Sequence, residues 1–177
     1  MRSFHSVLAA LFVACLLPVA DARAASINIV ALGASQTAGR GNGRHSGGVS
    51  PDEAFPARLE SLLRARGYDA HVTNAGVAGD TTDGMLGRLD SSVPAGTNLV
   101  ILQPGTNDGR KGASAGRAVN VPLIIQSLKA RGIKVIMANV ASAAAYVGPD
   151  GQHLTAEGQN VVAQNLLPRV IAAVGRR

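Results

Sequence analysis

The chain has 177 residues, of which 46% are hydrophobic and 16% are charged. This composition allows one domain of ordinary size to bury a core, and it excludes an intrinsically disordered chain. The formal charge is +6, but the basic residues are scattered and there is no tryptophan to stack on bases. We therefore expect no nucleic-acid partner.

The N-terminus has the pattern of a secretory signal peptide. Arg2 provides a positive charge, an apolar run follows, and Ala22-Arg23-Ala24 resembles a cleavage site. The run is about 14 residues long, whereas roughly 20 are needed to cross a bilayer. We therefore predict a signal peptide at 1–24 and a single domain at 25–177. The protein would be periplasmic or secreted, with no stable membrane span after cleavage.

Two alternatives remain for this segment, an uncleaved membrane anchor and a lipoprotein acylated on Cys15. Cys15 is the only cysteine, and it lies in the middle of the apolar run. Cleavage would leave a mature chain without a thiol, which excludes cysteine catalysis and zinc–thiolate sites there.

Beyond the predicted signal peptide, short apolar runs alternate with amphipathic stretches. The apolar runs predict strands at 27–32, 70–74, 99–103 and 134–140. The amphipathic stretches predict helices at 52–66, 81–89, 120–131 and 155–174. Asn120 and Thr155 are candidate N-caps of the last two helices, and Pro122 would then fall in a first turn, where proline is tolerated.

Strands that alternate with helices and are apolar along their length predict a parallel sheet covered on both faces. Right-handed crossovers make it an α/β fold, a three-layer α/β/α sandwich with about four mostly parallel strands. Sites in such folds lie at the carboxyl ends of the strands. Three of the four predicted strands are followed there by polar residues and glycines: Gly33-Ala34-Ser35, Asn74-Ala75-Gly76 and Gly105-Thr106-Asn107-Asp108.

Ser35, Asp150 and His153 are candidates for hydrolytic chemistry. A serine hydrolase needs a base beside its nucleophile and a carboxylate that fixes the tautomer of the base. Asp150 precedes His153 by three residues, so one tight turn can supply both groups. Taken alone, each residue is also an ordinary turn residue. The other histidines of the mature chain are His45, in a glycine-rich loop, and His71, within a predicted strand.

Hydrolysis of an ester also needs donors that stabilise an oxyanion, and these are often the largest single contribution to catalysis. Gly79 offers a backbone N–H after the second predicted strand, and Asn107 offers a side-chain amide after the third. Either residue by itself could be a simple turn residue.

Four segments, in this order, resemble the sequence blocks of the SGNH (GDSL-like) hydrolases. The segment 33–39 reads Gly-Ala-Ser-Gln-Thr-Ala-Gly and resembles the first block, which is usually Gly-Asp-Ser-Leu. The segment 74–82 resembles the second block, 105–108 matches the third, and 150–154 resembles the fifth. The resemblance covers nearly all of the mature chain.

The resemblance implies a flavodoxin-like SGNH fold and an exported serine esterase that needs no metal or organic cofactor. Its substrate would be a small carboxylic ester or thioester, as in the bacterial arylesterases, thioesterases and lysophospholipases. Ser35 would form the acyl-enzyme, His153 would act as base and then acid, and Asp150 would orient His153. The backbone N–H groups of Ser35 and Gly79 and the side chain of Asn107 would form the oxyanion hole.

Two departures from the family stand out. Ala34 stands where the family usually has aspartate, and Gln36 where it usually has leucine. Because the carboxylate at position 34 is absent, acceptors that would brace the loops around the nucleophile are expected to be missing. The segment between Asn107 and Asp150 is also short for the family. It predicts that a fifth strand is absent and that one wall of the substrate cleft is incomplete.

Three other functions compete with the esterase. A carbohydrate O-deacetylase could use the same fold, although the mature chain has only Phe55, Tyr68 and Tyr146 to stack on sugars. A non-catalytic binding module is conceivable because the first block has lost its aspartate. A dinucleotide or phosphate binder is disfavoured, because neither phosphate-binding glycine pattern fits after the first predicted strand.

Overall fold

The computed structural model describes residues 26–41 and 47–175. The predicted signal peptide and His45 lie outside the described residues. Within them, no helix is both long enough and apolar enough to cross a membrane.

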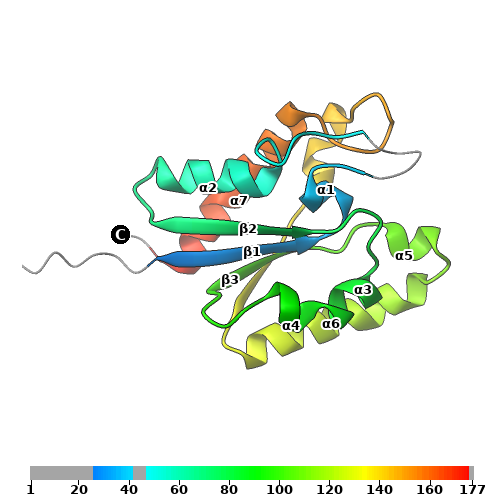
Figure 1. Cartoon of the computed structure of the whole chain (residues 1–177), viewed down its shortest axis with the longest axis horizontal. Coiled ribbons are helices and arrows are strands. Elements are labelled where there is room, and N and C mark those ends of the chain that lie inside the picture. The colour runs from blue at the N-terminus through cyan, green and yellow to red at the C-terminus, as the bar shows by residue number, and fades with distance from the viewer. Residues whose placement is uncertain (1–25, 42–46, 176–177) are drawn as a thin grey trace, which may run out of the picture.

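A four-stranded parallel sheet, in the order β2-β1-β3-β4, forms the centre of the fold (Figure 1). Its strands are β1 (Ile27–Gly33), β2 (Ala70–Gly76), β3 (Leu99–Gln103) and β4 (Lys134–Met137). The central strand β3 is buried along its whole length, as expected where both faces of a sheet are covered. The predicted four-stranded parallel sheet is confirmed. Strand β4 ends three residues early, because the chain then turns into the 3-10 helix η2 (Val140–Tyr146).

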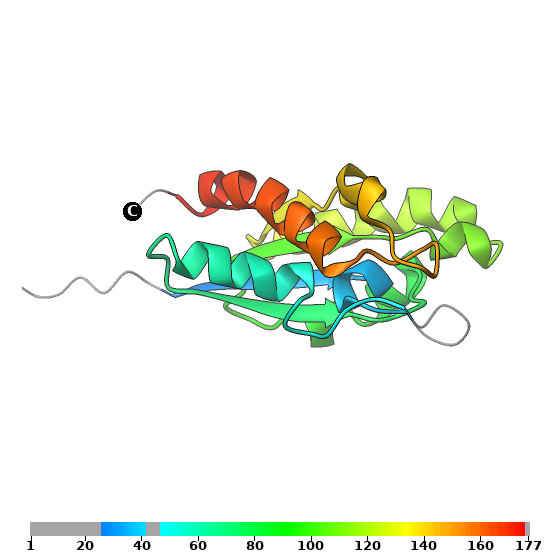
Figure 2. The ribbon, with the colours of Figure 1, turned by 90° about the horizontal axis from the view of Figure 1, so that it is seen from above.

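Helices cover both faces of this sheet, which gives the predicted three layers (Figures 1 and 2). One face carries α2 (Phe55–Arg64) and α7 (Ala156–Val174), and the other carries α3 (Thr82–Gly87), α4 (Leu89–Ser92) and α6 (Ser114–Ala130). Alternation along β1 serves both layers, since Ile29 and Ala31 pack with α2 and α7, while Val30 and Leu32 pack with α3, α4 and α6.

The two predicted N-caps have different outcomes. Thr155 caps α7, and its hydroxyl accepts the Gly158 N–H at 3.3 Å, as predicted. Asn120 does not begin a helix, because α6 starts at Ser114 and contains both Asn120 and Pro122. The early start was missed because the first turns of α6 are small, polar and mostly exposed, so they lack the apolar spacing that signals a helix.

Two short helices begin at the carboxyl edge of the sheet. Helix α1 (Ser35–Ala38) follows β1, and α5 (Asn107–Arg110) follows β3 (Figure 1). Both therefore present their first residues at the edge where the sequence predicts the site.

Gly76 allows β2 to lie against α1. A Cβ at this position would be 2.1 Å from the Ala38 nitrogen and 2.6 Å from the Thr37 carbonyl carbon. Because both are backbone atoms, rotating a side chain cannot relieve the contact. Gly76→Ala should therefore lower the free energy of unfolding by about 1–3 kcal/mol, the usual cost of overpacking.

Urea denaturation measures this loss. Gly87→Ala is the matched control, because Gly87 is exposed and a Cβ there would have no atom within 4 Å. Its effect should stay within about 0.5 kcal/mol. Equal effects of the two substitutions would contradict the close approach of β2 and α1.

Candidate active site

Ser35 is the first residue of α1 and lies at the carboxyl end of β1. The first N–H of a helix has no acceptor within the helix, so the Ser35 N–H is available to a ligand. The residue is buried, with 7% of its surface exposed. Gly33 permits the sharp turn from strand to helix, because a Cβ there would be 2.1 Å from Thr37 Oγ1 and 2.8 Å from the Gln103 carbonyl oxygen.

Asp150 and His153 share the turn that precedes α7. Asp150 Oδ1 accepts the backbone N–H groups of Gln152 at 3.0 Å and of His153 at 2.9 Å, and Oδ2 lies 2.5 Å from His153 Nδ1. The hydrogen bonds from the His153 backbone and then from its ring hold the pKa of Asp150 well below its usual range. Asp150 is therefore ionised and favours the tautomer with a proton on Nδ1, which leaves His153 Nε2 as an acceptor.

Ser35, Gly79, Asn107 and His153 line one small pocket of about 120 Å³. Gly79 has a φ of 78°, and within 26–41 and 47–175 its N–H has no hydrogen-bond partner. One N–H of the Asn107 side chain donates to the Asp80 carbonyl at 2.8 Å, which fixes the amide and leaves its second N–H free to donate. With Asp150 bonded to His153, the fold brings together all five predicted site residues.

His71 lies elsewhere, on an exposed position of β2, where its Nδ1 is 3.2 Å from Glu60 Oε2. Among the described residues, no three His, Cys, Asp or Glu side chains are grouped as a metal ion would require. Among the described residues that line the small pocket, the titratable side chains are those of His153 and Arg110.

Comparison with known proteins places this arrangement in a family. A model of the GDSL-like lipase/acylhydrolase family matches residues 31–176. The chain belongs to the GDSL-like lipase/acylhydrolase family. Esterase TesA of Pseudomonas aeruginosa is 35% identical over 98 residues, which are 52% of this chain and 47% of that protein. The chain spans about half the length of the curated relatives it matches.

Solved structures of GDSL-like enzymes share the fold. A crystal structure of TesA aligns with 84% of this chain and 99% of its own, at a TM-score of 0.69 and 22% identity. AlinE4, described as an SGNH-hydrolase family esterase, aligns with 86% of this chain and 98% of its own, at a TM-score of 0.60 and 26% identity. The predicted SGNH fold is therefore confirmed.

The turn that carries Ser35 is braced without the usual GDSL aspartate. The buried Gln103 Oε1, at the end of β3, accepts from the Ala34 N–H and from Thr37 Oγ1, both at 3.1 Å. Arg88, from the neighbouring helices, donates to the Gly33 carbonyl at 3.1 Å. The expectation that acceptors are missing around the turn is wrong, because the Gln103 amide oxygen accepts two hydrogen bonds there. Gln103 was missed because it is the last residue of an apolar strand, with no signal of its own.

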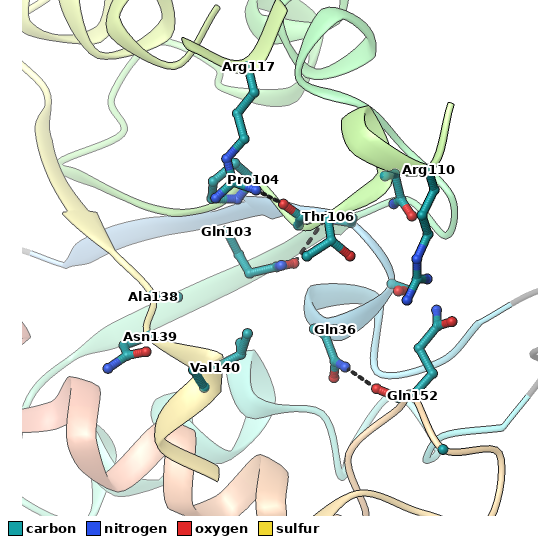
Figure 3. A pocket seen from close by; sticks show the side chains of 16 residues that line it. Gln36, Gln103, Pro104, Thr106, Arg110, Arg117, Ala138, Asn139, Val140 and Gln152 are labelled. Atoms are coloured by element: carbon teal, nitrogen blue, oxygen red, sulfur yellow. Dashed lines mark hydrogen bonds between the residues drawn. The ribbon is translucent and has the colours of Figure 1, made fainter. Parts of the chain in front are cut away.

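Gln36 joins the nucleophile helix to the histidine turn. Its Nε2 donates to the Gln152 carbonyl at 2.7 Å (Figure 3), and its Oε1 accepts the Leu154 N–H at 3.4 Å. These two partners are the chain neighbours of His153 on either side, so the Gln36 side chain brackets the histidine. A leucine, usual here in the family, makes neither bond. Gln36, which the sequence marked only as an unusual polar residue, thus holds the turn that carries His153.

The sequence predicts that one wall of the substrate cleft is incomplete. In the structure, the short segment after β4 lines a cavity beside Ser35. A larger cavity, of about 400 Å³, opens beside Ser35 and is lined on one side by residues 138–141. Figure 3 shows Ala138, Asn139 and Val140 along this side, where β4 leads into η2. The described part of the chain has four strands, and η2 follows β4, the edge strand of the sheet.

Asp150→Asn should destabilise the fold at neutral pH, and its effect should shrink in acid. Because the pKa of Asp150 is lowered by folding, its carboxylate stabilises the fold fully above the ordinary pKa of about 3.9. That contribution is lost as the pH falls toward the lower pKa of the folded state. Urea denaturation of both proteins at about pH 7 and about pH 3 measures the difference.

Asp69→Asn is a charge-matched control at an exposed turn, and it should have a small effect at both pH values. A difference between the native protein and Asp150→Asn that stays constant with pH would contradict the role of the carboxylate.

Proposed function

We propose that this protein hydrolyses carboxylic esters through an acyl-enzyme formed on Ser35. The observation that carries the proposal is the small pocket that Ser35, Gly79, Asn107 and His153 line together, with the Asp150 carboxylate on His153 Nδ1. Membership of the GDSL-like family supports it, as do relatives whose names describe esterases.

In the first step, Ser35 Oγ attacks the carbonyl carbon of the ester, and the hydroxyl proton passes to His153 Nε2. The contact between Asp150 and His153 Nδ1 holds the ring and stabilises the imidazolium that forms. The carbonyl electrons move onto oxygen. This oxyanion is stabilised by hydrogen bonds from the backbone N–H groups of Ser35 and Gly79 and from the free N–H of Asn107.

Collapse of this intermediate breaks the bond to the alcohol or thiol, which leaves with the proton from His153. Water then attacks the acyl group on Ser35, giving one proton to His153, and the carboxylic acid is released as that proton returns to Ser35 Oγ. Bonds and protons balance over the cycle, and water is the only co-reactant.

The Gln152 side chain lies beside the nitrogen of His153 that would accept the proton. Its Nε2 lies 3.3 Å from His153 Nε2, and because that nitrogen is the acceptor of the ring, the amide donates to it. The distance exceeds the usual length of about 2.9 Å, so the bond is weak. We infer that the Ser35 hydroxyl displaces this amide when a substrate is bound.

We also propose that the protein is exported, with residues 1–24 removed as a signal peptide and 25–177 folding as the single catalytic domain. The support is the sequence pattern alone, with Arg2, the apolar run and Ala22-Arg23-Ala24 in the order that export signals show.

Ser35→Ala should reduce hydrolysis of 4-nitrophenyl acetate by about a thousandfold or more, because no acyl-enzyme can form. A fluorophosphonate should label the native protein at Ser35, as mass spectrometry of the labelled peptide would show. Ser61→Ala, at an exposed serine of α2, is the control and should keep both activities. A folded native protein that neither hydrolyses esters nor takes the label would be a binding module.

Gln36→Leu should lower kcat about tenfold with little change in KM, because two neutral hydrogen bonds of about 1 kcal/mol each no longer hold the histidine turn. The rate of fluorophosphonate labelling should fall with kcat, and the urea midpoint should also fall, because the same two bonds stabilise the folded protein. Gln126→Leu, on the exposed side of α6, is the control. A pure rise in KM would show that Gln36 binds substrate instead.

A further inference from the structure

The larger cavity beside Ser35 continues the catalytic pocket. Ser35, Asn107, Arg110 and Gln152 line both cavities, so an ester bound at the nucleophile extends into the larger one. Apart from Pro104, its described lining has one aliphatic side chain larger than alanine, that of Val140. Such a surface stabilises a bound acyl chain little, because it offers few apolar side chains against which the chain could be buried.

The side chains that line this cavity carry positive charge, and no carboxylate among its described lining residues balances it. Arg110 and Arg117 line it, and none of its described lining residues is an aspartate or glutamate. The carboxylates nearest the site are bound to other groups. Asp80 pairs with Arg88 at 2.8 Å, Asp108 accepts from Thr82, and Asp150 holds His153.

Arg110 has the more open guanidinium of the two. It extends from α5 toward Gln152 (Figure 3), and among the described residues its side chain has no hydrogen bond or ion pair. Arg117 is anchored by a hydrogen bond from Nη1 to the Gly105 carbonyl, which leaves most of its five N–H donors unused. The two fork-shaped groups suit an oxyanion with two or more oxygens.

We propose that the enzyme selects esters that carry a second, anionic group, a carboxylate or phosphate, and that Arg110, assisted by Arg117, binds that group. The inference rests on the proposed esterase activity of Ser35 and deepens it by naming the substrate class. The anion lies a few bonds from the scissile carbonyl, on either the acyl or the alcohol portion, because the cavity begins at Ser35 itself.

Matched ester pairs test this and distinguish the two portions. On the acyl side, mono-4-nitrophenyl adipate is compared with 4-nitrophenyl hexanoate, and on the alcohol side, 4-acetoxybenzoate with its methyl ester. The native enzyme should favour the anionic member of at least one pair in kcat/KM by about tenfold or more, and added salt should reduce the preference. Arg110→Gln should lower that ratio about tenfold, and Arg110→Lys should restore only part of it.

Arg66→Gln removes the same charge from an exposed position outside both cavities and should leave the ratios and both rates unchanged. Neutral ester hydrolysis with no preference for either anionic ester would overturn the inference and leave the proposed function intact. A preference that survives in an Arg110→Gln, Arg117→Gln double variant would also overturn it. Failure of all four esters, with no fluorophosphonate label on Ser35, would overturn the proposed function and this inference together.

Discussion

The sharp turn between β1 and α1 is the constraint on which the site depends. Because Gly33 has no side chain to clash with Thr37 and Gln103, the chain can leave the strand and enter a helix within two residues. That turn places the backbone N–H of Ser35 at the start of a helix and its side chain at the strand end. Gly76 permits the same close approach from β2. Ser35 therefore lies where the loops after β2 and β3 begin, because all three strands are parallel.

Amide groups hold this turn to the rest of the molecule. Gln103 fixes the turn to β3, and Gln36 fixes it to the histidine turn. Gln159, fully buried in α7, accepts the Phe55 N–H at 2.9 Å and donates to the Gln36 carbonyl at 3.2 Å. Each bond is neutral and individually modest, but the donors and acceptors are buried or partly buried and satisfy one another. The position of His153 relative to Ser35 thus depends on hydrogen bonds between amides.

The sequence predicts the fold and the candidate residues better than it predicts their supports. Apolar runs locate all four strands. The side-chain types that ester hydrolysis requires single out Ser35, Asp150 and His153 as candidates, and the fold brings these three together. Gln103 carries no such demand, since its role arises only when β3 lies beside β1. The start of α6 at Ser114 was missed for a related reason, because its first turns contact solvent and need no apolar face. A local sequence pattern indicates which residues are buried and which can do chemistry. The brace by Gln103 and the start of α6 depend instead on what lies beside them in the folded protein.

The bracing by a neutral amide and the positive charge of the larger cavity both agree with alanine at position 34. Ala34 lines the larger cavity, so an aspartate there, as the family usually has, would bring a negative charge into the space that Arg110 faces. Opposite charges at short range offset one another strongly where water is partly excluded. With alanine at this position and Gln103 as the brace, the guanidinium charge stays available to a substrate. Alanine at position 34 therefore leaves the described lining of the cavity without a carboxylate, while the contacts that hold the turn at Ser35 remain satisfied.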